Sequence, residues 1–276
     1  MPCNKKGAEN MPQTTFDSHV FYSALGEQCT HCSLKVYSSL DSTNSEVRRL
    51  ATQGAAEGTL VIAEEQYQGR GRQGRQFFSP SSTGLYMSLL LRPKEDVSPL
   101  LITTAAAVAV TQAVEEIVGI PAQIKWVNDI YCREKKVCGI LTEGSFFQNS
   151  KKLQYAVLGI GINLLPPPDG FPEDIKNRAG SLYEQEKPPI FLKEKLAATV
   201  VKNFWERYKN LNAKTCLDEY RRRSMLLGKT VEVLTVTGEV TDVAVVTGIS
   251  DTFALQVITT DGIKKELSSG EVSIRL

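Results

Sequence analysis

The sequence predicts an α+β protein followed by a small, separate β domain. Strand and helix patterns alternate through residues 33–225, whereas five short β-rich runs separated by turns follow from Lys229 to the end of the chain. Such closely spaced short strands are typical of a small barrel. The change of pattern places a domain boundary near residue 226, so that residues 226–276 form the second domain. Residues 1–32 start polar and without periodicity, and we expect them to form a flexible tail whose first 28 residues are dispensable for chemistry.

The elements of the larger domain follow from periodicity and from residues that begin or end helices. Residues 41–54 form a predicted helix that Ser42 or Thr43 caps and Gly54 ends. Apolar residues recur every three or four positions over 97–118 and 190–211, which predicts two further helices. Strands are expected over residues 34–40, 59–66, 84–92 and 153–165, with two more joined by a polar turn within 122–144.

Composition indicates a soluble globular protein with no strong overall charge. Of its 276 residues, 42% are hydrophobic and 23% charged, and the formal net charge is +1. No overall field therefore draws the chain to nucleic acid or to an anionic membrane. The most apolar run, residues 100–120, is interrupted by threonines, Gln112, Glu115 and Glu116, which fits a buried helix better than a membrane span. The N-terminus lacks the apolar core of a signal peptide, so we expect a cytoplasmic protein.

The cysteines fit the same compartment. There are 6 of them, scattered along the chain, which is consistent with reduced thiols in a cytosolic setting. Cys29 and Cys32 form a C-x-x-C with His31 between them, and a zinc or redox role for this pair stays open. No second pair of ligands has matching spacing, which disfavours such a role.

A loop rich in glycine and arginine is the most distinctive motif. Within "AEEQYQGRGRQGRQFFSP", residues 63–80, Gly69, Gly71 and Gly74 spell G-x-G-x-x-G. The dinucleotide-binding version of this motif needs a helix directly after the loop, but here Pro80, serines and a strand follow. An NAD-binding oxidoreductase is therefore disfavoured. The interleaved arginines, residues 70, 72 and 75, indicate local binding of an anion. A non-enzymatic nucleic-acid-binding protein could use the same loop, but the cluster occurs once and net charge is near zero.

Three further motifs carry polar groups suited to a small ligand. They are "DSTN" at residues 41–44, "KWVNDIY" at 125–131 and "GIGIN" at 159–163. Each has a plain structural alternative: a helix cap, a strand with an Asn-Asp turn, and a tightly packed core strand. Their combination with the arginine loop is what needs a common explanation.

From about Leu34 to the C-terminus, these motifs resemble those of biotin protein ligases. The family's G-R-G-R-x-G-R is met by residues 69–75, its K-W-P-N-D by residues 125–129 with Val127 in place of proline, and its following aromatic by Phe77. G-I-L-x-E and G-x-G-I-N are met by residues 139–143 and 159–163. The resemblance implies a mixed β-sheet catalytic domain backed by helices over 33–225, and an SH3-like C-terminal barrel.

The resemblance also implies an activity and its partners. Such a ligase makes biotinyl-5′-adenylate from biotin and ATP, with Mg²⁺ carried on the ATP phosphates rather than held in a protein metal site. It then transfers biotin to a lysine of a biotin carboxyl carrier protein or domain. Lipoate or octanoate protein ligases share the fold and the adenylate chemistry, and stay the nearest alternative. Because about 33 residues precede the catalytic region, we expect no DNA-binding domain; no membrane is expected, and a homodimer is left open.

Residue roles follow from position within the family motifs. Lys125 and Arg72 are the expected catalytic residues. The residues expected to bind biotin are Ser42, Thr43, Asn44, Gln66, Gly69, Arg70, Gly71, Arg72, Lys125, Gly139 and Gly159. The residues expected to bind ATP are Arg72, Arg75, Phe77, Lys125, Asn128 and Asn163, with Phe77 stacking on adenine.

Overall fold

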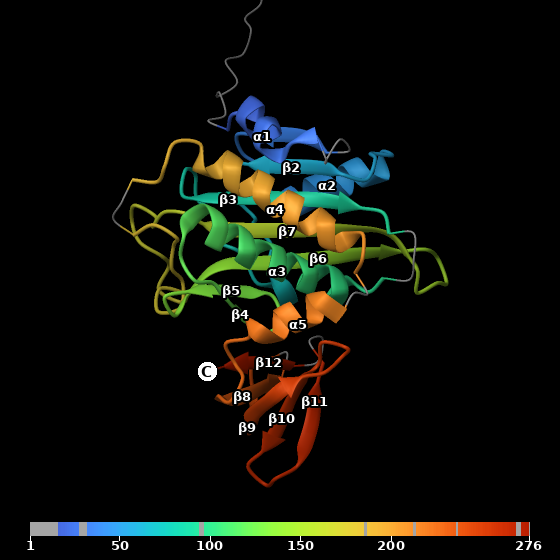
Figure 1. Cartoon of the computed structure of the whole chain (residues 1–276), viewed down its shortest axis with the longest axis vertical. Coiled ribbons are helices and arrows are strands. Elements are labelled where there is room, and N and C mark those ends of the chain that lie inside the picture. The colour runs from blue at the N-terminus through green and yellow to red at the C-terminus, as the bar shows by residue number, and fades with distance from the viewer. Residues whose placement is uncertain are drawn as a thin grey trace, which may run out of the picture.

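The computed structural model describes residues 16–27, 32–93, 97–184, 187–211, 214–235, 237–268 and 272–275. Its strands form two sheets, one in the N-terminal part and one at the C-terminus (Figure 1). The predicted α+β class and the separate C-terminal β unit are therefore confirmed.

The central sheet is mixed. Its strands are β1 (Ser33–Tyr37), β2 (Thr59–Ala63), β3 (Gly84–Leu91), β4 (Gln123–Lys125), β5 (Asp129–Cys132), β6 (Lys135–Phe146) and β7 (Leu153–Asn163). They lie in the order β1-β2-β3-β7-β6-β5-β4. Only β1 and β2 are parallel, joined by a helical crossover, and the other neighbouring pairs are antiparallel. The sequence predicted two strands within 122–144, and the structure adds the short β4 to β5 and β6.

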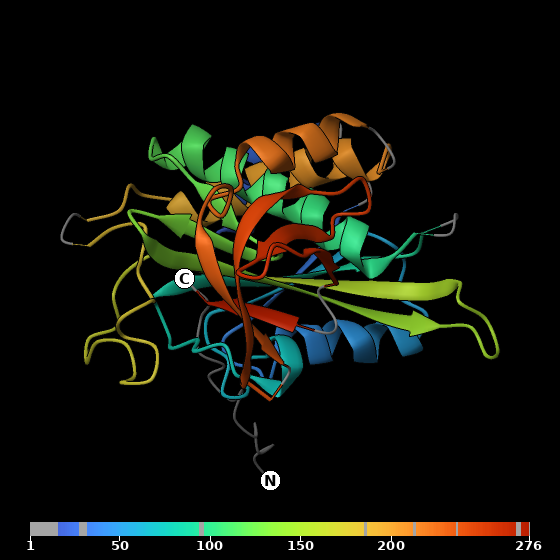
Figure 2. The same ribbon diagram turned by 90° about the horizontal axis from the view of Figure 1, so that it is seen from below.

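Helices cover both faces of this sheet, with more of them on one face than on the other. They are α1 (Ser18–Leu25), α2 (Thr43–Thr52), α3 (Pro99–Val118), α4 (Leu192–Tyr208) and α5 (Lys214–Arg222). Figure 2 shows α2 on one face, with α3, α4 and α5 on the other. Ser98 caps α3, with its Oγ accepting from the N–H of Leu101, and Gly119 ends the helix in the left-handed conformation. In length and hydropathy α3 could cross a membrane, but it is mostly buried inside the protein, as the sequence predicted.

The second sheet contains five antiparallel strands, β8 (Thr230–Thr235), β9 (Val240–Ile249), β10 (Leu255–Thr259), β11 (Lys264–Leu267) and β12 (Val272–Arg275). Their order is β11-β10-β9-β8-β12. The small antiparallel β unit was predicted, whereas its closure into an SH3-like barrel stays a prediction.

The predicted N-terminal tail is wrong for the part that the structure describes. Asp17 begins α1 by accepting hydrogen bonds from the backbone N–H groups of His19 and Val20. Phe21 is 0% exposed and lies in the main core, where α1 packs against α4. The backbone N–H of Asp17 also donates to Glu194 Oε1 at 2.9 Å. An isolated two-turn helix shows little periodicity, and its stability comes from packing that the sequence pattern does not reveal.

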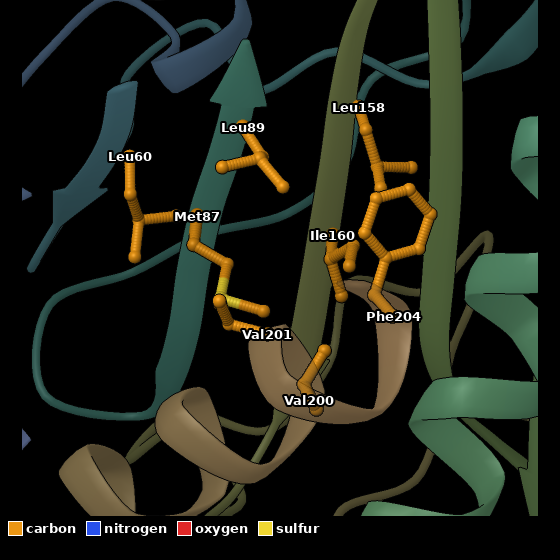
Figure 3. A pocket seen from close by; sticks show the side chains of 8 residues that line it. All are labelled: Leu60, Met87, Leu89, Leu158, Ile160, Val200, Val201 and Phe204. Carbon is orange, nitrogen blue, oxygen red and sulfur yellow. The ribbon is translucent and has the colours of Figure 1, made fainter. Parts of the chain in front are cut away.

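The main core lies on the face of the sheet that α4 covers. Side chains from β2, β3 and β7 meet side chains from α4 around a small apolar gap (Figure 3), lined by Leu60, Met87, Leu89, Leu158, Ile160, Val200, Val201 and Phe204. Because successive strand residues point to opposite faces, Ser88, Gly159 and Gly161 face the other side. The gap is thus a feature of the core, and the polar residues of the motifs lie on the opposite face.

Candidate active site

The strand register brings residues of several motifs into one row. Lys125 pairs with Asp129, Asp129 with Gly139, and Gly139 with Gly161. Directly opposed residues in a sheet share a face. One row across β4, β5, β6 and β7 therefore places an ammonium and a carboxylate beside two glycines that leave the sheet surface bare.

The start of α2 supplies a buried polar cluster at the neighbouring row. Ser42, Thr43 and Asn44 are 2%, 3% and 4% exposed. The backbone N–H and the hydroxyl of Thr43 both donate to Gln66 Oε1, at 2.8 and 3.1 Å. Ser88 Oγ lies 2.7 Å from Thr43 Oγ1 and 2.6 Å from Asn44 Oδ1. The predicted residues Ser42, Thr43, Asn44 and Gln66 are therefore brought together.

The arginine loop folds back on itself next to this cluster. The N–H of Gly71 donates to Arg75 O at 2.7 Å, and the N–H of Phe77 donates to Gly69 O at 2.9 Å. A Cβ at residue 69 would lie 2.3 Å from Phe77 O, so only glycine fits there. Residues Arg72–Gly74 form a short 3-10 turn between these bonds. No helix follows, which removes the dinucleotide-binding interpretation of the glycines.

Two arginines of the loop contact the strands. Arg72 donates from Nη1 to Asn128 Oδ1 at 3.0 Å, and Asn128 Nδ2 donates to Ile140 O at 2.7 Å. Arg70 forms an ion pair with Glu143 at 2.8 Å. The third, Arg75, is exposed. Arg72 is thus fixed against Asn128, while Arg75 is exposed to solvent.

Phe77 lies on the bare glycine surface. A Cβ added at Gly161 would lie 2.5 Å from the Phe77 ring, and one at Gly139 would lie 3.1 Å from it. The ring edge also faces Tyr86, with ring centroids 6.3 Å apart at 71°. At Gly159, an added Cβ would lie 2.1 Å from Asn44 Oδ1. The glycines of β6 and β7 therefore leave room for side chains from the loop and from α2.

Lys125, Arg72 and Lys136 lie around one carboxylate, that of Asp129. Burial is the main cause that lowers the pKa of Lys125, with Lys136 and Arg178 adding to it and Asp129 opposing it. Burial likewise lowers the pKa of Arg72, and Asp129 again opposes the shift. Positive groups close together in a partly dry site, with little carboxylate to balance them, favour binding of an anion.

Lys136 was missed by the sequence analysis, which placed it in a polar turn. Its Nζ lies 2.6 Å from Asp129 Oδ1, and its Cε would lie 3.5 Å from a Cβ on Gly139. A β-bulge at Val137 explains why Lys136 lies on the open face of the sheet. Ile130 pairs with Cys138, but the next residue, Tyr131, pairs with Lys136, so that Val137 has no partner. The extra residue turns Lys136 to the open face. Without knowledge of the bulge, strict alternation would have put it on the core face.

Two other predicted features lie elsewhere or outside the described residues. Asn163 ends β7, and its Nδ2 donates to Gly180 O at 2.9 Å, so it fixes the following loop. Of the C-x-x-C pair, Cys29 lies outside the described residues and Cys32 is buried. Among the residues that the structure describes, no group of three or more His, Cys, Asp or Glu side chains could hold a metal ion.

The C-terminal domain contacts the segment between β4 and β5 through the turn that contains Phe253. The indole N–H of Trp126 donates to Phe253 O at 2.9 Å, and the hydroxyl of Tyr220 donates to Val127 O at 2.9 Å. The rings of Tyr220 and Phe253 meet edge to face, 5.5 Å apart. The turn between β9 and β10 therefore supports the segment that carries Lys125 and Asn128.

Comparisons with known proteins identify a family. A model of the Biotin/lipoate A/B protein ligase family matches residues 36–163. The biotin protein ligase from Aquifex aeolicus, solved in complex with biotin and ATP, superposes with a TM-score of 0.73 and 33% identity, covering 88% of this chain and 98% of that one. The bifunctional ligase/repressor BirA of Bacillus subtilis is 44% identical over 147 residues, which are 52% of this chain.

The extent of the matches differs among relatives. The alignment spans 44% of the Bacillus subtilis protein, less than half of its length. A biotin–[acetyl-CoA-carboxylase] ligase of Mycobacterium tuberculosis is 28% identical over 213 residues, covering 72% of this chain and 74% of that protein.

Proposed function

Because the chain belongs to the biotin protein ligase family, we propose that it forms biotinyl-5′-adenylate from biotin and ATP and transfers the biotinyl group to a lysine of a biotin carboxyl carrier domain. The observation that carries this proposal is the row of Lys125, Asp129, Gly139 and Gly161 beside the folded arginine loop. That arrangement combines the Phe77 ring, which rests on the two glycines and would stack on adenine, with cations for phosphates.

In the first step, a carboxylate oxygen of biotin attacks the α-phosphorus of ATP, the bond to the bridging oxygen breaks, and pyrophosphate leaves. The difficulty is electrostatic, because an anion must approach a polyanion. Lys125, Lys136 and Arg72 would neutralise this charge from fixed positions around Asp129. Preorganised cations in a water-poor site are worth more than the same cations in water.

In the second step, the neutral amine of a carrier lysine attacks the acyl carbon of the adenylate. An amide bond forms, AMP leaves with the electron pair of the broken bond, and one proton is released. The mixed anhydride reacts with any amine, so it must be retained until the carrier lysine arrives. The loop, held by Arg70 on Glu143 and by Arg72 on Asn128, would retain it and exclude water.

The head of biotin would occupy the polar cluster at the start of α2. Ser42, Thr43 and Gln66 offer hydroxyl, amide and backbone groups that suit a ureido ring. In the described structure Thr43 and Gln66 bond to each other, so biotin would replace these internal hydrogen bonds with its own. A lipoyl or octanoyl chain has no such head, which favours biotin.

Mg²⁺ belongs to the substrate in this proposal. The described residues bring together no set of three or more metal-ligating side chains, and the carboxylate in the row, Asp129, is paired with Lys136. In the proposed reaction Mg²⁺ is carried by the phosphates of ATP.

The proposal also assigns a role to each of the two domains. We assign the biotin and ATP sites to residues 33–225 and a supporting role to residues 226–276, with the boundary near residue 226. The contacts of Trp126 and Tyr220 with the β9–β10 turn support this assignment. The absence of DNA binding, the cytoplasmic location and the state of association stay predictions.

The test is direct. The purified chain is incubated with ATP, Mg²⁺ and either biotin, lipoate or octanoate, and each acyl-adenylate is measured by mass spectrometry. Transfer to a carrier domain is then followed by streptavidin blot. We expect biotinyl-adenylate and a biotinylated carrier. Lipoyl- or octanoyl-adenylate in greater yield than biotinyl-adenylate would instead assign the chain to the lipoate branch, and none from folded protein would reject the proposal.

A further inference from the structure

A single carboxylate joins the arginine loop to α2 and to β6. Glu143 Oε1 accepts hydrogen bonds from Arg70 Nη2 of the loop and from Arg48 Nη2 of α2, each at 2.8 Å. Glu143 Oε2 accepts from Asn44 Nδ2, also at 2.8 Å. The Glu143 side chain is 17% exposed, so this ion pair is better shielded from water than an ordinary surface pair.

The two guanidinium groups depend on that carboxylate to lie so close together. Arg48 and Arg70 are 46% and 44% exposed, and both reach the same oxygen of Glu143. Without the negative charge they would repel each other. Arg48 belongs to a helix held by its own hydrogen bonds, whereas Arg70 belongs to a loop. Loss of the carboxylate would therefore move the loop rather than the helix.

A second side-chain contact holds the other side of the loop. Arg72 bonds to Asn128 on the side of β5, and Arg70 bonds to Glu143 on the side of α2. Between them lies the 3-10 turn, in which Gln73 has φ of 55°. The loop is thus held at each side by a hydrogen bond from an arginine, in addition to its own backbone bonds.

Glu143 also fixes the orientation of the Asn44 amide. A carboxylate only accepts hydrogen bonds, so the NH₂ of Asn44 must face Glu143. The oxygen of the amide then faces Ser88 Oγ, at 2.6 Å. The polar cluster at the start of α2 thus has one defined pattern of donors and acceptors.

We propose that Glu143 is a positioning residue, which holds the arginine loop closed over the biotin end of the site and orients Asn44 for recognition of the ligand head. The part of this inference that concerns biotin rests on the proposed function. The part that concerns the loop rests only on the contacts of Arg70 and Glu143.

The experiment uses the full chain and four single variants, each with glutamine. Glu143→Gln and Arg70→Gln break the anchor. Arg48→Gln removes the other arginine on the same carboxylate, and Arg49→Gln removes a neighbouring arginine whose ion pairs are with Asp41 and Glu46. Hydrogen–deuterium exchange of the peptide covering residues 69–77 reports loop opening without any need for ligand.

We expect exchange of this peptide to rise about three- to tenfold in the Glu143 and Arg70 variants, the scale of a partly shielded charged pair. The Arg48 and Arg49 variants should exchange like the parent. The double variant Arg70→Gln/Glu143→Gln should open the loop no more than either single variant, because both remove one contact. If Arg70→Gln exchanges like the parent, the Arg70–Glu143 ion pair does not hold the loop closed. This comparison remains valid even if Glu143→Gln folds poorly.

Kinetics test the biotin part separately. In Glu143→Gln, the KM for biotin should rise about three- to tenfold while kcat at saturating biotin and ATP stays within about twofold. If the loop peptide of Glu143→Gln exchanges faster but the KM for biotin is unchanged, Glu143 holds the loop but has no role in biotin recognition. If no variant or parent makes biotinyl-adenylate, the proposed function fails, but the exchange comparison still decides whether Glu143 holds the loop.

Discussion

Substituting Gly161 by alanine should weaken the use of ATP, because Phe77 lies directly on this glycine. A Cβ at residue 161 would lie 2.5 Å from Cε1 and 2.7 Å from Cζ of the Phe77 ring. Carbon atoms pack at roughly 3.5–4.0 Å, so the ring would have to move by about 1 Å. If Phe77 stacks on adenine, loss of that stacking costs about 0.5–1.5 kcal/mol. The KM for ATP should then rise about two- to twelvefold.

Gly139→Ala is the matched control, since the same methyl group there would meet the same ring at 3.1 Å. That overlap is relieved by a smaller shift, so its effect on the KM should be weaker. The assay is ATP–pyrophosphate exchange against ATP concentration at saturating biotin, with thermal unfolding to show that both variants are folded. The reasoning is wrong if folded Gly161→Ala keeps the parent KM, or if Gly139→Ala is the more damaging of the two.

Three other predictions concern the lysines and the N-terminal helix. Burial lowers the pKa of Lys125, so its charge is present at low pH and is lost as pH rises through a value below the ordinary 10.5. The rate of ATP–pyrophosphate exchange should therefore fall at alkaline pH, and in Lys125→Arg this fall should move to higher pH. A fall at the same pH in both proteins would exclude Lys125 as its cause. Lys136→Met should slow adenylate formation by roughly 100- to 1,000-fold, as expected for loss of a preorganised charge; a folded variant with a near-normal rate in mass spectrometry would remove Lys136 from the chemistry. Phe21→Ala should lower the free energy of unfolding by about 3–5 kcal/mol in urea titration, because the ring is fully buried; a loss under about 1 kcal/mol would show that α1 contributes little, as the tail interpretation required.

The sequence predicted the elements whose own residues define them. Helix α3 has its cap at Ser98, its end at Gly119 and a long apolar stretch between, so its existence and ends could be found from local signals. Helix α1 has a cap at Asp17 too, but only two turns, and its burial depends on α4, far away in the chain. Burial against a distant element leaves no periodic signal in a segment this short.

The same limit explains which parts of the candidate site could be found. Motif residues such as Lys125 and Thr43 were identified because their neighbours in sequence fit a known pattern. Lys136 was not, since its position on the open face depends on the bulge at Val137. Glu143 was seen only as the end of a motif, because its role is defined by Arg48 and Arg70, which come from other elements. Bulges and long-range ion pairs are properties of pairing, which a single sequence does not display.

The residues expected to bind ligands bond to one another or to neighbouring side chains in the described structure. Thr43 donates to Gln66, Asn44 donates to Glu143, and Arg72 donates to Asn128. A buried polar group without a partner costs about 1–3 kcal/mol, so a site built of such groups must satisfy them internally before a ligand arrives. Binding then exchanges hydrogen bonds rather than adding them, and the net gain per bond is small. A ligand that fails to replace even one of them leaves a buried group unpaired, so this cluster should discriminate more strongly by hydrogen-bond pattern than by size.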